Sequence, residues 1–408
     1  MRYHISTVLM LLFCICQQLS SISYFSGIHL IYFCWLISTF VSYGIRARYI
    51  IFTKKYIILY LFLAFYFMSM IAATNLTTGF ARLVAMMEML SPIYMYDLYQ
   101  VNKWNGKKYP FYVLIIVLLA NMMLSFSMIN IMGDTGLRNT IQADSDNALK
   151  GAFSLIYSLS IIIPTIVYVL KSRKKIGAKS KSIVLVASIL FGVYSFILVF
   201  RSYFITALIT TIVGVLFALI YEKRRWLLKG GSIILVAISV FLASFTSLVS
   251  YIDNISYGAS RQITPKLYEL KYLLTGETTK AGDLSSRANL ALSSLNTFLE
   301  NPIVGVSYKA KDFEDTIMIG VGNHSEWLDN LALYGLFSLL LFSFIYMASK
   351  QQLTQYGFSL SLLLFFFLGC NNPVLSFSML CNVFLLIPMF FDIIKLSNNG
   401  NRNCNSRL

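Results

Sequence analysis

The sequence predicts an all-α polytopic membrane protein with about twelve transmembrane helices and one large outer loop. Of its 408 residues, 57% are hydrophobic and only 12% are charged, and the mean hydropathy is +0.70. Apolar runs of about 16 to 22 residues recur along the chain, and roughly 20 residues of helix cross a bilayer core of about 30 Å. The runs lack the alternation of a membrane β-strand. This composition excludes a soluble enzyme, a disordered regulator and a disulfide scaffold.

The apolar runs define the predicted spans in chain order. They are 5–22, 24–43, 56–73, 80–100, 110–131, 151–170, 183–200, 203–221, 231–250, 327–348, 356–371 and 374–394.

These spans divide the chain into four parts. Residues 1–250 hold the first nine helices and a short outer loop at 132–150, and residues 251–326 form the large outer loop. Residues 327–395 hold the last three helices, and 396–408 is a polar cytoplasmic tail.

The charge distribution gives the orientation. The net charge is +16, but 22 of the 33 Lys and Arg residues fall in the segments that face inward if the N-terminus is cytoplasmic. The segment 251–325 faces outward and is close to neutral. Because basic residues collect on the cytoplasmic side of membrane proteins, both termini are expected inside the cell. The excess charge therefore needs no nucleic-acid partner: it orients the helices and contacts the lipid bilayer.

The segment 251–325 is much longer than an ordinary connection, so we expect it to carry function. Within it, the run SSRANLALSSLNTFLENP predicts an amphipathic helix that Ser285 or Ser286 caps and Pro302 ends. Its apolar face is expected on the outer leaflet or against the bundle. Arg287 lies in the first turn, where its charge and the helix dipole together favour an anion.

His324 lies where the large loop re-enters the membrane. A neutral imidazole suits proton transfer from a hydroxyl near pH 7. Glu326 and Asp329 follow closely and are candidates for orienting the ring. The alternative interpretation is a surface histidine beside a helix cap.

Three further charged residues fall in or beside apolar runs. Arg201 lies between two of them, where burying a guanidinium costs at least about 2.5 kcal/mol, so a partner such as phosphate is expected. Snorkelling to the headgroups is the alternative. Arg82 and Glu88 lie in span 80–100. A carboxylate inside a membrane span is a functional candidate, although a purely structural ion pair would look the same in the sequence.

The cysteine and histidine spacings predict neither a metal site nor a cofactor site. The chain has 6 Cys and 3 His, and most of the cysteines fall inside predicted spans.

Three motifs resemble the bacterial O-antigen polymerase and O-antigen ligase superfamily. The first is HSEWLDNLALYG, in which His324 and Ser325 are followed, after nine residues, by Gly335. The second is SSRANLALSSLNTFLENPIVGV, similar to the Arg-bearing outer-loop helix of the family, and the third is FRSYFITALI, which contains Arg201. The chain departs from the family pattern at Ser338, where Gly, Thr or Tyr is common.

The resemblance implies inverting, metal-independent glycosyl transfer at the outer face of the cytoplasmic (inner) membrane. The substrate would be an oligosaccharide linked to undecaprenyl diphosphate, and a protein that regulates chain length is a further partner. His324 would act as the general base, while Arg287 and Arg201 would hold the diphosphate.

Within the superfamily, the pairing of His324 and Ser325 followed by Trp-Leu-Asp is more similar to polymerases, which use a second lipid-linked repeat unit as the acceptor. A ligase, which transfers glycan to lipid A-core, is the alternative. A polysaccharide flippase or transporter would need charged residues along its path, and the spans carry few.

Overall fold

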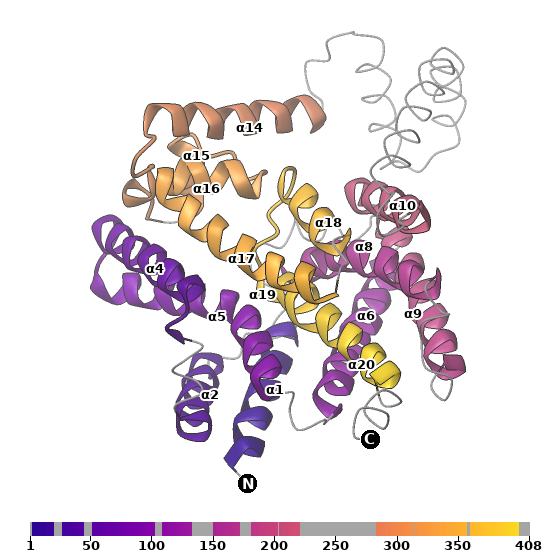
Figure 1. Ribbon diagram of the computed structural model, residues 1–408. Helices are drawn as coiled ribbons and strands as arrows, with labels where there is room; N and C mark the ends of the chain where they lie inside the picture. The colour runs from indigo at the N-terminus through magenta and orange to yellow at the C-terminus, as the bar shows by residue number, and fades with distance from the viewer. Residues whose placement is uncertain are drawn as a thin grey trace, which may run out of the picture.

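The computed structural model describes residues 2–19, 27–44, 51–102, 108–132, 150–171, 181–202, 204–220, 283–311, 313–356 and 360–399 (Figure 1). Within these ranges every regular element is helical.

The helices of the first part of the chain are α1 (Arg2–Leu19), α2 (Ile28–Tyr43), α4 (Lys54–Ala73), α5 (Leu76–Asn102), α6 (Tyr109–Met132), α8 (Lys150–Lys171), α9 (Lys181–Arg201) and α10 (Ile205–Ile220). Those of the second part are α14 (Asp283–Glu300), η5 (Ser307–Lys309), α15 (Phe313–Met318), α16 (Glu326–Tyr334), η6 (Gly335–Phe337), α17 (Ser338–Tyr356), α18 (Leu360–Gly369), α19 (Phe377–Leu380), η7 (Cys381–Leu386) and α20 (Ile387–Asn399).

The all-α membrane fold is confirmed. In the part of the chain that the structure describes, four helical segments are long and apolar enough to cross a bilayer: Lys54–Ala73, Tyr109–Ser127, Phe153–Lys171 and Glu326–Gln352. Shorter apolar helices coincide with most of the other predicted spans. The predicted span 231–250 and the predicted loop 132–150, apart from its two end residues, lie outside the described residues.

Two predicted elements differ in detail. The outer-loop helix α14 begins at Asp283, so Ser285 and Ser286 lie inside its first turns and do not cap it. The predicted span 327–348 is divided at Gly335, whose φ of +56° ends α16 before α17 begins. A residue with a side chain rarely adopts this backbone conformation, so the glycine sets the position of the break.

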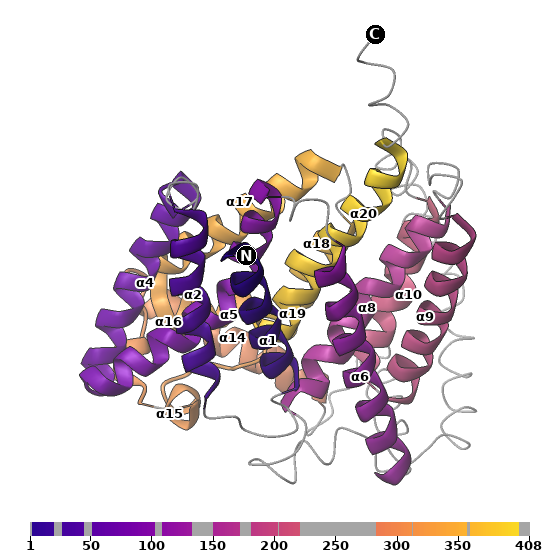
Figure 2. The ribbon, with the colours of Figure 1, turned by 90° about the horizontal axis from the view of Figure 1, so that it is seen from below.

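The helices pack as a bundle with a shorter helical unit at its edge. The pairs α1 with α2, α4 with α5 and α17, and α8 with α9 and α10 form the main contacts. α14 and α16 pack on each other, and α15 lies beside them (Figure 1). Seen from below, many of the spans run side by side, with α15 at one end and α20 at the other (Figure 2).

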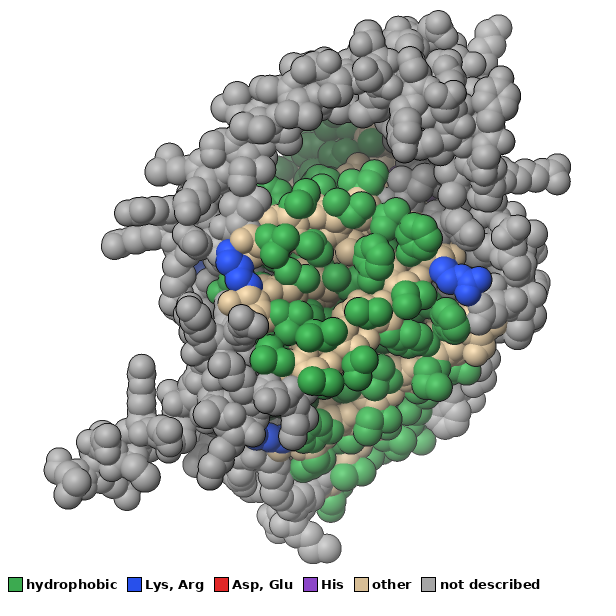
Figure 3. Space-filling view, turned by 90° about the vertical axis from the view of Figure 1, so that its right-hand side faces the viewer, with side chains coloured by type: hydrophobic (Ala, Val, Ile, Leu, Met, Phe, Trp, Pro, Cys, Tyr) green, Lys and Arg blue, Asp and Glu red, His purple; other side chains and the backbone are tan. Residues whose placement is uncertain are grey.

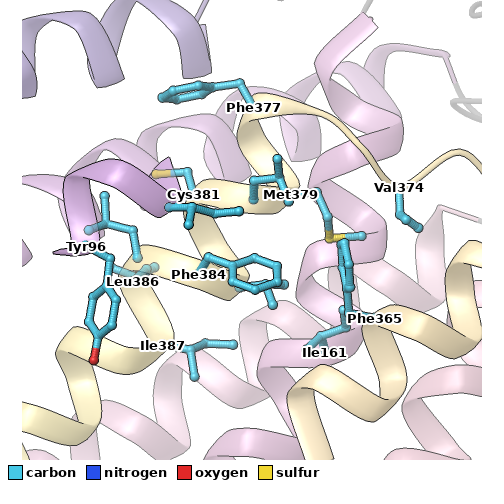
Figure 4. Packing of buried hydrophobic residues seen from close by; sticks show 14 of the residues in the cluster. Tyr96, Ile161, Phe365, Val374, Phe377, Met379, Cys381, Phe384, Leu386 and Ile387 are labelled. Atoms are coloured by element: carbon cyan, nitrogen blue, oxygen red, sulfur yellow. The ribbon is translucent and has the colours of Figure 1, made fainter. Parts of the chain in front are cut away.

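Aromatic and aliphatic side chains fill the centre of the bundle (Figure 4). Phe365 of α18 and Phe384 of η7 are fully buried and meet edge to face, with ring centroids 5.4 Å apart. η7 is a π-helix, and it packs against α5 and α8 as well as against its neighbours α19 and α20. The wider π turn therefore lies in the core and not at a frayed end.

The outer surface of α9 and α10 has the character of a lipid-facing surface. Leu190, Val193 and Phe200 of α9 and Leu216 of α10 are more than half exposed. In the described part of this face, hydrophobic side chains form a continuous area with a few Lys and Arg near its edges (Figure 3). Such a surface is stable in hydrocarbon, where exposed charge is costly.

A polar layer joins α4, α5 and α17 at one end of the bundle. The Lys55 ammonium donates to the Asp97 carboxylate at 2.5 Å and to the Gln351 side-chain oxygen at 3.2 Å. Lys54 and Lys350 beside it are exposed. We call Lys55, Asp97 and Gln351 the Lys55 layer; because charged and exposed lysines avoid hydrocarbon, it marks one boundary of the membrane core.

Candidate active site

His324 lies in the short link between α15 and α16. It is half-buried, and Ser325 after it forms the N-cap of α16, its hydroxyl accepting from the Leu328 N–H. Asn323 before it has a φ of +56°, and among the described residues it alone has a positive φ without being glycine. The Asn323 amide donates to the Thr316 hydroxyl of α15 at 2.9 Å. The imidazole is therefore carried on a short segment whose backbone is held in an unusual conformation.

Asp329 holds this link to α14. Its carboxylate accepts the Ser325 N–H at 2.9 Å and the Ser294 hydroxyl of α14 at 2.6 Å. The Ser294 oxygen in turn accepts the Gly322 N–H at 2.8 Å. Each of these groups is buried, so each hydrogen bond satisfies a group that would be costly to leave unpaired. Asp329, in the first turn of α16, thus positions the backbone of His324 through its hydrogen bond with Ser325.

The turn of α14 that follows Arg287 contacts the same link. A Cβ placed on Gly322 would lie 2.2 Å from the Leu290 carbonyl oxygen, so only glycine permits this approach. Arg287 precedes Leu290 by about one helical turn; its side chain lies outside the described residues. The structure therefore brings the backbone that carries Arg287 close to the backbone that carries His324.

Gly305 and Gly335, which we call the glycine pair, join α16 to the turn after α14. A Cβ on Gly305 would lie 2.3 Å from the Leu333 carbonyl oxygen, and a Cβ on Gly335 would lie 2.5 Å from the Ile303 carbonyl oxygen. Both glycines also have a positive φ. The two backbones approach so closely because neither residue has a side chain.

Two backbone hydrogen bonds cross the same contact. The Leu336 N–H donates to the Pro302 carbonyl at 2.8 Å, and the Val306 N–H donates to the Ala332 carbonyl at 3.0 Å. The Asn-Pro…Gly part of one motif and the His…Gly part of the other therefore form one structural unit, α14–α16.

The Glu326 carboxylate hydrogen-bonds to other groups than the expected His324 ring. Its carboxylate accepts the N–H groups of Val374 and Leu375 at 2.8 and 2.9 Å, and the Asn330 amide donates to it at 2.6 Å. Glu326 thus ties α16 to the connection between α18 and α19. The interpretation that it orients the His324 ring gives way to this structural role.

Trp327 fixes the same helix against α18. Its indole N–H donates to the Phe366 carbonyl at 2.9 Å. A Cβ on Gly369 would lie 2.5 Å from its ring, so a glycine again permits the contact.

Arg201 ends α9 and is exposed. Its guanidinium lies over the Phe126 ring of α6, 5.7 Å from the centroid. α9 packs mainly against α8 and α6. Convergence of Arg201 with His324 stays a prediction.

Comparison with known families agrees with the motifs. Residues 190–343 match the family model described as O-antigen ligase. This range includes Arg201, Arg287, His324 and the glycine pair. The match supports the O-antigen ligase and polymerase superfamily for this part of the chain. No curated protein and no solved structure matches the chain.

Ser338, the departure from the superfamily pattern, hydrogen-bonds at the break between α16 and α17. It is fully buried, and its hydroxyl donates to the Gly335 carbonyl at 2.7 Å. The serine therefore caps the break in the helix and supports the glycine that the superfamily motif contains.

The two candidates in span 80–100, Arg82 and Glu88, have structural partners. The Arg82 guanidinium donates to the Lys311 carbonyl, which ties α5 to the segment between η5 and α15. Glu88 accepts from the Gln17 amide at 3.2 Å and shares a 2.7 Å hydrogen bond with His29. The polar cluster of Glu88 therefore joins α1, α2 and α5.

Sequence reasoning missed Ser294, Gly322 and Asn323. A small polar residue in the middle of an apolar helix face and the Val-Gly-Asn run before His324 were available signals. Among the described residues no group of three or more His, Cys, Asp or Glu is placed to hold a metal ion.

Proposed function

We propose that this protein is a surface polysaccharide polymerase of the O-antigen type, which joins repeat units carried on undecaprenyl diphosphate. The observation that carries the proposal is the match of residues 190–343 to the O-antigen ligase family, because that range holds the link in which Asp329 positions His324. The transfer takes place at the outer face of the bacterial inner membrane, with both termini of the chain in the cytoplasm.

In the proposed reaction, the imidazole of His324 takes the proton of an acceptor hydroxyl. The hydroxyl oxygen then attacks the anomeric carbon of the donor sugar, and the bond from that carbon to the diphosphate oxygen breaks with its electron pair. Arg287 and Arg201 stabilise the negative charge of the departing diphosphate, since a guanidinium binds phosphate through two parallel hydrogen bonds. The proton then passes from the imidazole to water. Direct displacement inverts the anomeric carbon, and with two guanidiniums on the leaving group the step needs no metal ion.

The acceptor distinguishes the two activities of the superfamily. The Ser-Glu-Trp-Leu-Asp run after His324 is more similar to polymerases, so we assign the acceptor as a second lipid-linked repeat unit. A protein that sets the length of the polymer would be its partner in the membrane. The alternative activity is ligation of the glycan to lipid A-core. A polysaccharide flippase, which is a transporter and not an enzyme of this superfamily, is the third candidate function.

The banding pattern of surface glycans in a deletion strain tests this proposal. A polymerase defect leaves surface glycans that carry a single repeat unit. A ligase defect leaves no attached repeats and accumulates lipid-linked polymer, and a flippase defect keeps the repeat units on the cytoplasmic side. Either of the last two patterns would overturn the assignment.

The His324→Ala variant tests the role of the imidazole. At normal protein level it should reproduce the deletion pattern, and full-length glycan in this variant would remove His324 as the base. Arg287→Lys keeps the charge but loses the planar fork, so we expect a shortened glycan distribution.

A further inference from the structure

The segment 302–309, which follows α14 and includes η5, exposes apolar side chains in an unusual place. Ile303 is 65% exposed and Val304 is 43% exposed, and the Tyr308 ring is also exposed. An exposed apolar cluster of this kind on a membrane protein needs a partner. Whether that partner is lipid depends on the height of the segment within the bilayer, which two helices of the bundle measure.

α4 provides the first measure of this level. Lys55 lies in the Lys55 layer, and Ser69 follows it on the same helix after about 14 residues, or roughly 21 Å of helix length. The Ser69 and Ser307 hydroxyls are hydrogen-bonded at 2.5 Å. The segment 302–309 therefore contacts α4 at most about 21 Å from the Lys55 layer, and any tilt of the helix reduces that height.

α17 and η6 provide a second, independent measure. Gln351 contacts Lys55, and Leu336 lies about 15 residues before it, or roughly 22 Å along the helix. The Leu336 N–H donates to the Pro302 carbonyl. Both helices thus place the segment at the same height, which is less than the thickness of about 30 Å of the hydrocarbon core.

The surface around the segment is also apolar. Leu336 is 50% exposed and Leu339 is 48% exposed on the span that the segment contacts, and Met68 of α4 is 65% exposed. The apolar side chains of the segment therefore continue the lipid-facing surface of two spans. At the far end of the segment, the Lys309 ammonium lies 5.3 Å from the Tyr308 ring centroid, and a lysine stem can reach from this depth to the headgroups.

We propose that the segment 302–309 is inserted into one leaflet of the bilayer, with Ile303 and Val304 among the lipid acyl chains. It fixes the height of the α14–α16 unit relative to the membrane core, because the same turn carries one side of the glycine pair contact. The inference rests on the fold and the two height measures, and it does not depend on the proposed transfer reaction.

Spin-label accessibility in full-length protein tests the insertion. Ile303→Cys is introduced in a background whose accessible native cysteines are serine, and the nitroxide-labelled protein is reconstituted into vesicles of phosphatidylcholine and phosphatidylglycerol. Oxygen concentrates in hydrocarbon, whereas a charge-neutral nickel chelate stays in water. Leu339→Cys is the lipid-facing control, and Asn289→Cys, at an exposed position of α14 with Ser285 and Ser293 one turn away on either side, is the water-facing control.

The proposal predicts that the label at position 303 collides more with oxygen than with nickel chelate, as it does at position 339. A nickel preference equal to that at position 289 would overturn it. Protection from both reagents would also overturn it, because the site would then be covered by protein. If Ile303→Cys does not reconstitute, Val304→Cys is read by the same criteria.

Discussion

Replacing Gly335 by alanine tests whether the glycine pair holds the α14–α16 unit together. Gly335 has φ +56° and ψ −141°, a backbone region that is nearly specific for glycine, so alanine costs about 1–3 kcal/mol there. Its Cβ would also lie 2.5 Å from the Ile303 carbonyl oxygen. Because that neighbour is backbone, the turn at Ile303 must move away.

Gly44 provides a matched control. Its φ of +49° and ψ of −123° are close to those of Gly335, but a Cβ at Gly44 meets nothing within 4 Å. Gly44→Ala therefore carries the backbone cost without the steric overlap. The difference between the two variants isolates the contact with the turn after α14.

The size of that difference follows from the hydrogen bonds that cross the contact. Moving the turn breaks the bonds of the Leu336 and Val306 N–H groups, each with a contribution of about 1 kcal/mol. The unit should thus open more easily by about 2 kcal/mol, which corresponds to roughly 30-fold faster local exchange.

Amide hydrogen exchange of α16, measured by mass spectrometry on protein in lipid nanodiscs, checks this value. Gly335→Ala should accelerate exchange in 326–334 by at least about 30-fold relative to wild type, because backbone strain at position 335 adds to the loss of the two hydrogen bonds. Gly44→Ala should leave that segment at the wild-type rate. Equal exchange of α16 in wild type and Gly335→Ala would refute the structural role of the glycine pair.

Three other substitutions test separate polar contacts. Asp329→Asn leaves one acceptor oxygen for two donors, the Ser294 hydroxyl and the Ser325 N–H, so we expect loss of polymer at normal protein level. Ser294→Ala should have a weaker effect. Normal glycan banding in Asp329→Asn would contradict the positioning role. Lys55→Met leaves the Asp97 carboxylate buried without its cation, although the Tyr56 hydroxyl still donates to it. We expect a cost of about 3–5 kcal/mol in thermal unfolding, part of which Asp97→Leu should recover; no recovery would contradict the ion pair. Glu88→Gln retains hydrogen bonding to both partners, so glycan length should not change, and a loss of polymer in stable protein would mean that the Glu88 charge is functional.

The sequence predicted the all-α membrane fold, because hydropathy over about 20 residues reflects the thickness of the bilayer. It also located α14, since an apolar stripe with a following Pro302 is a local pattern. The break at Gly335 was not predicted, because its cause is a backbone contact with Ile303, far away in the chain.

The candidate site was predicted in part. His324, Arg287 and Arg201 were expected to act together at the outer face of the membrane, and the structure brings the backbones of His324 and the Arg287 helix together at Gly322. The hydrogen bonds of Glu326 to the connection between α18 and α19 could not be foreseen, since they depend on tertiary packing between segments about 48 residues apart. A free carboxylate and a carboxylate that binds backbone N–H groups have the same appearance in a sequence.

Polymer synthesis by purified protein tests the central claim most directly. Wild-type protein in vesicles with lipid-linked repeat units should extend them and release undecaprenyl diphosphate, one for each bond formed. The account predicts that His324→Ala, with α16 exchange unchanged, forms neither product. Polymer from that variant at the wild-type rate would contradict the account.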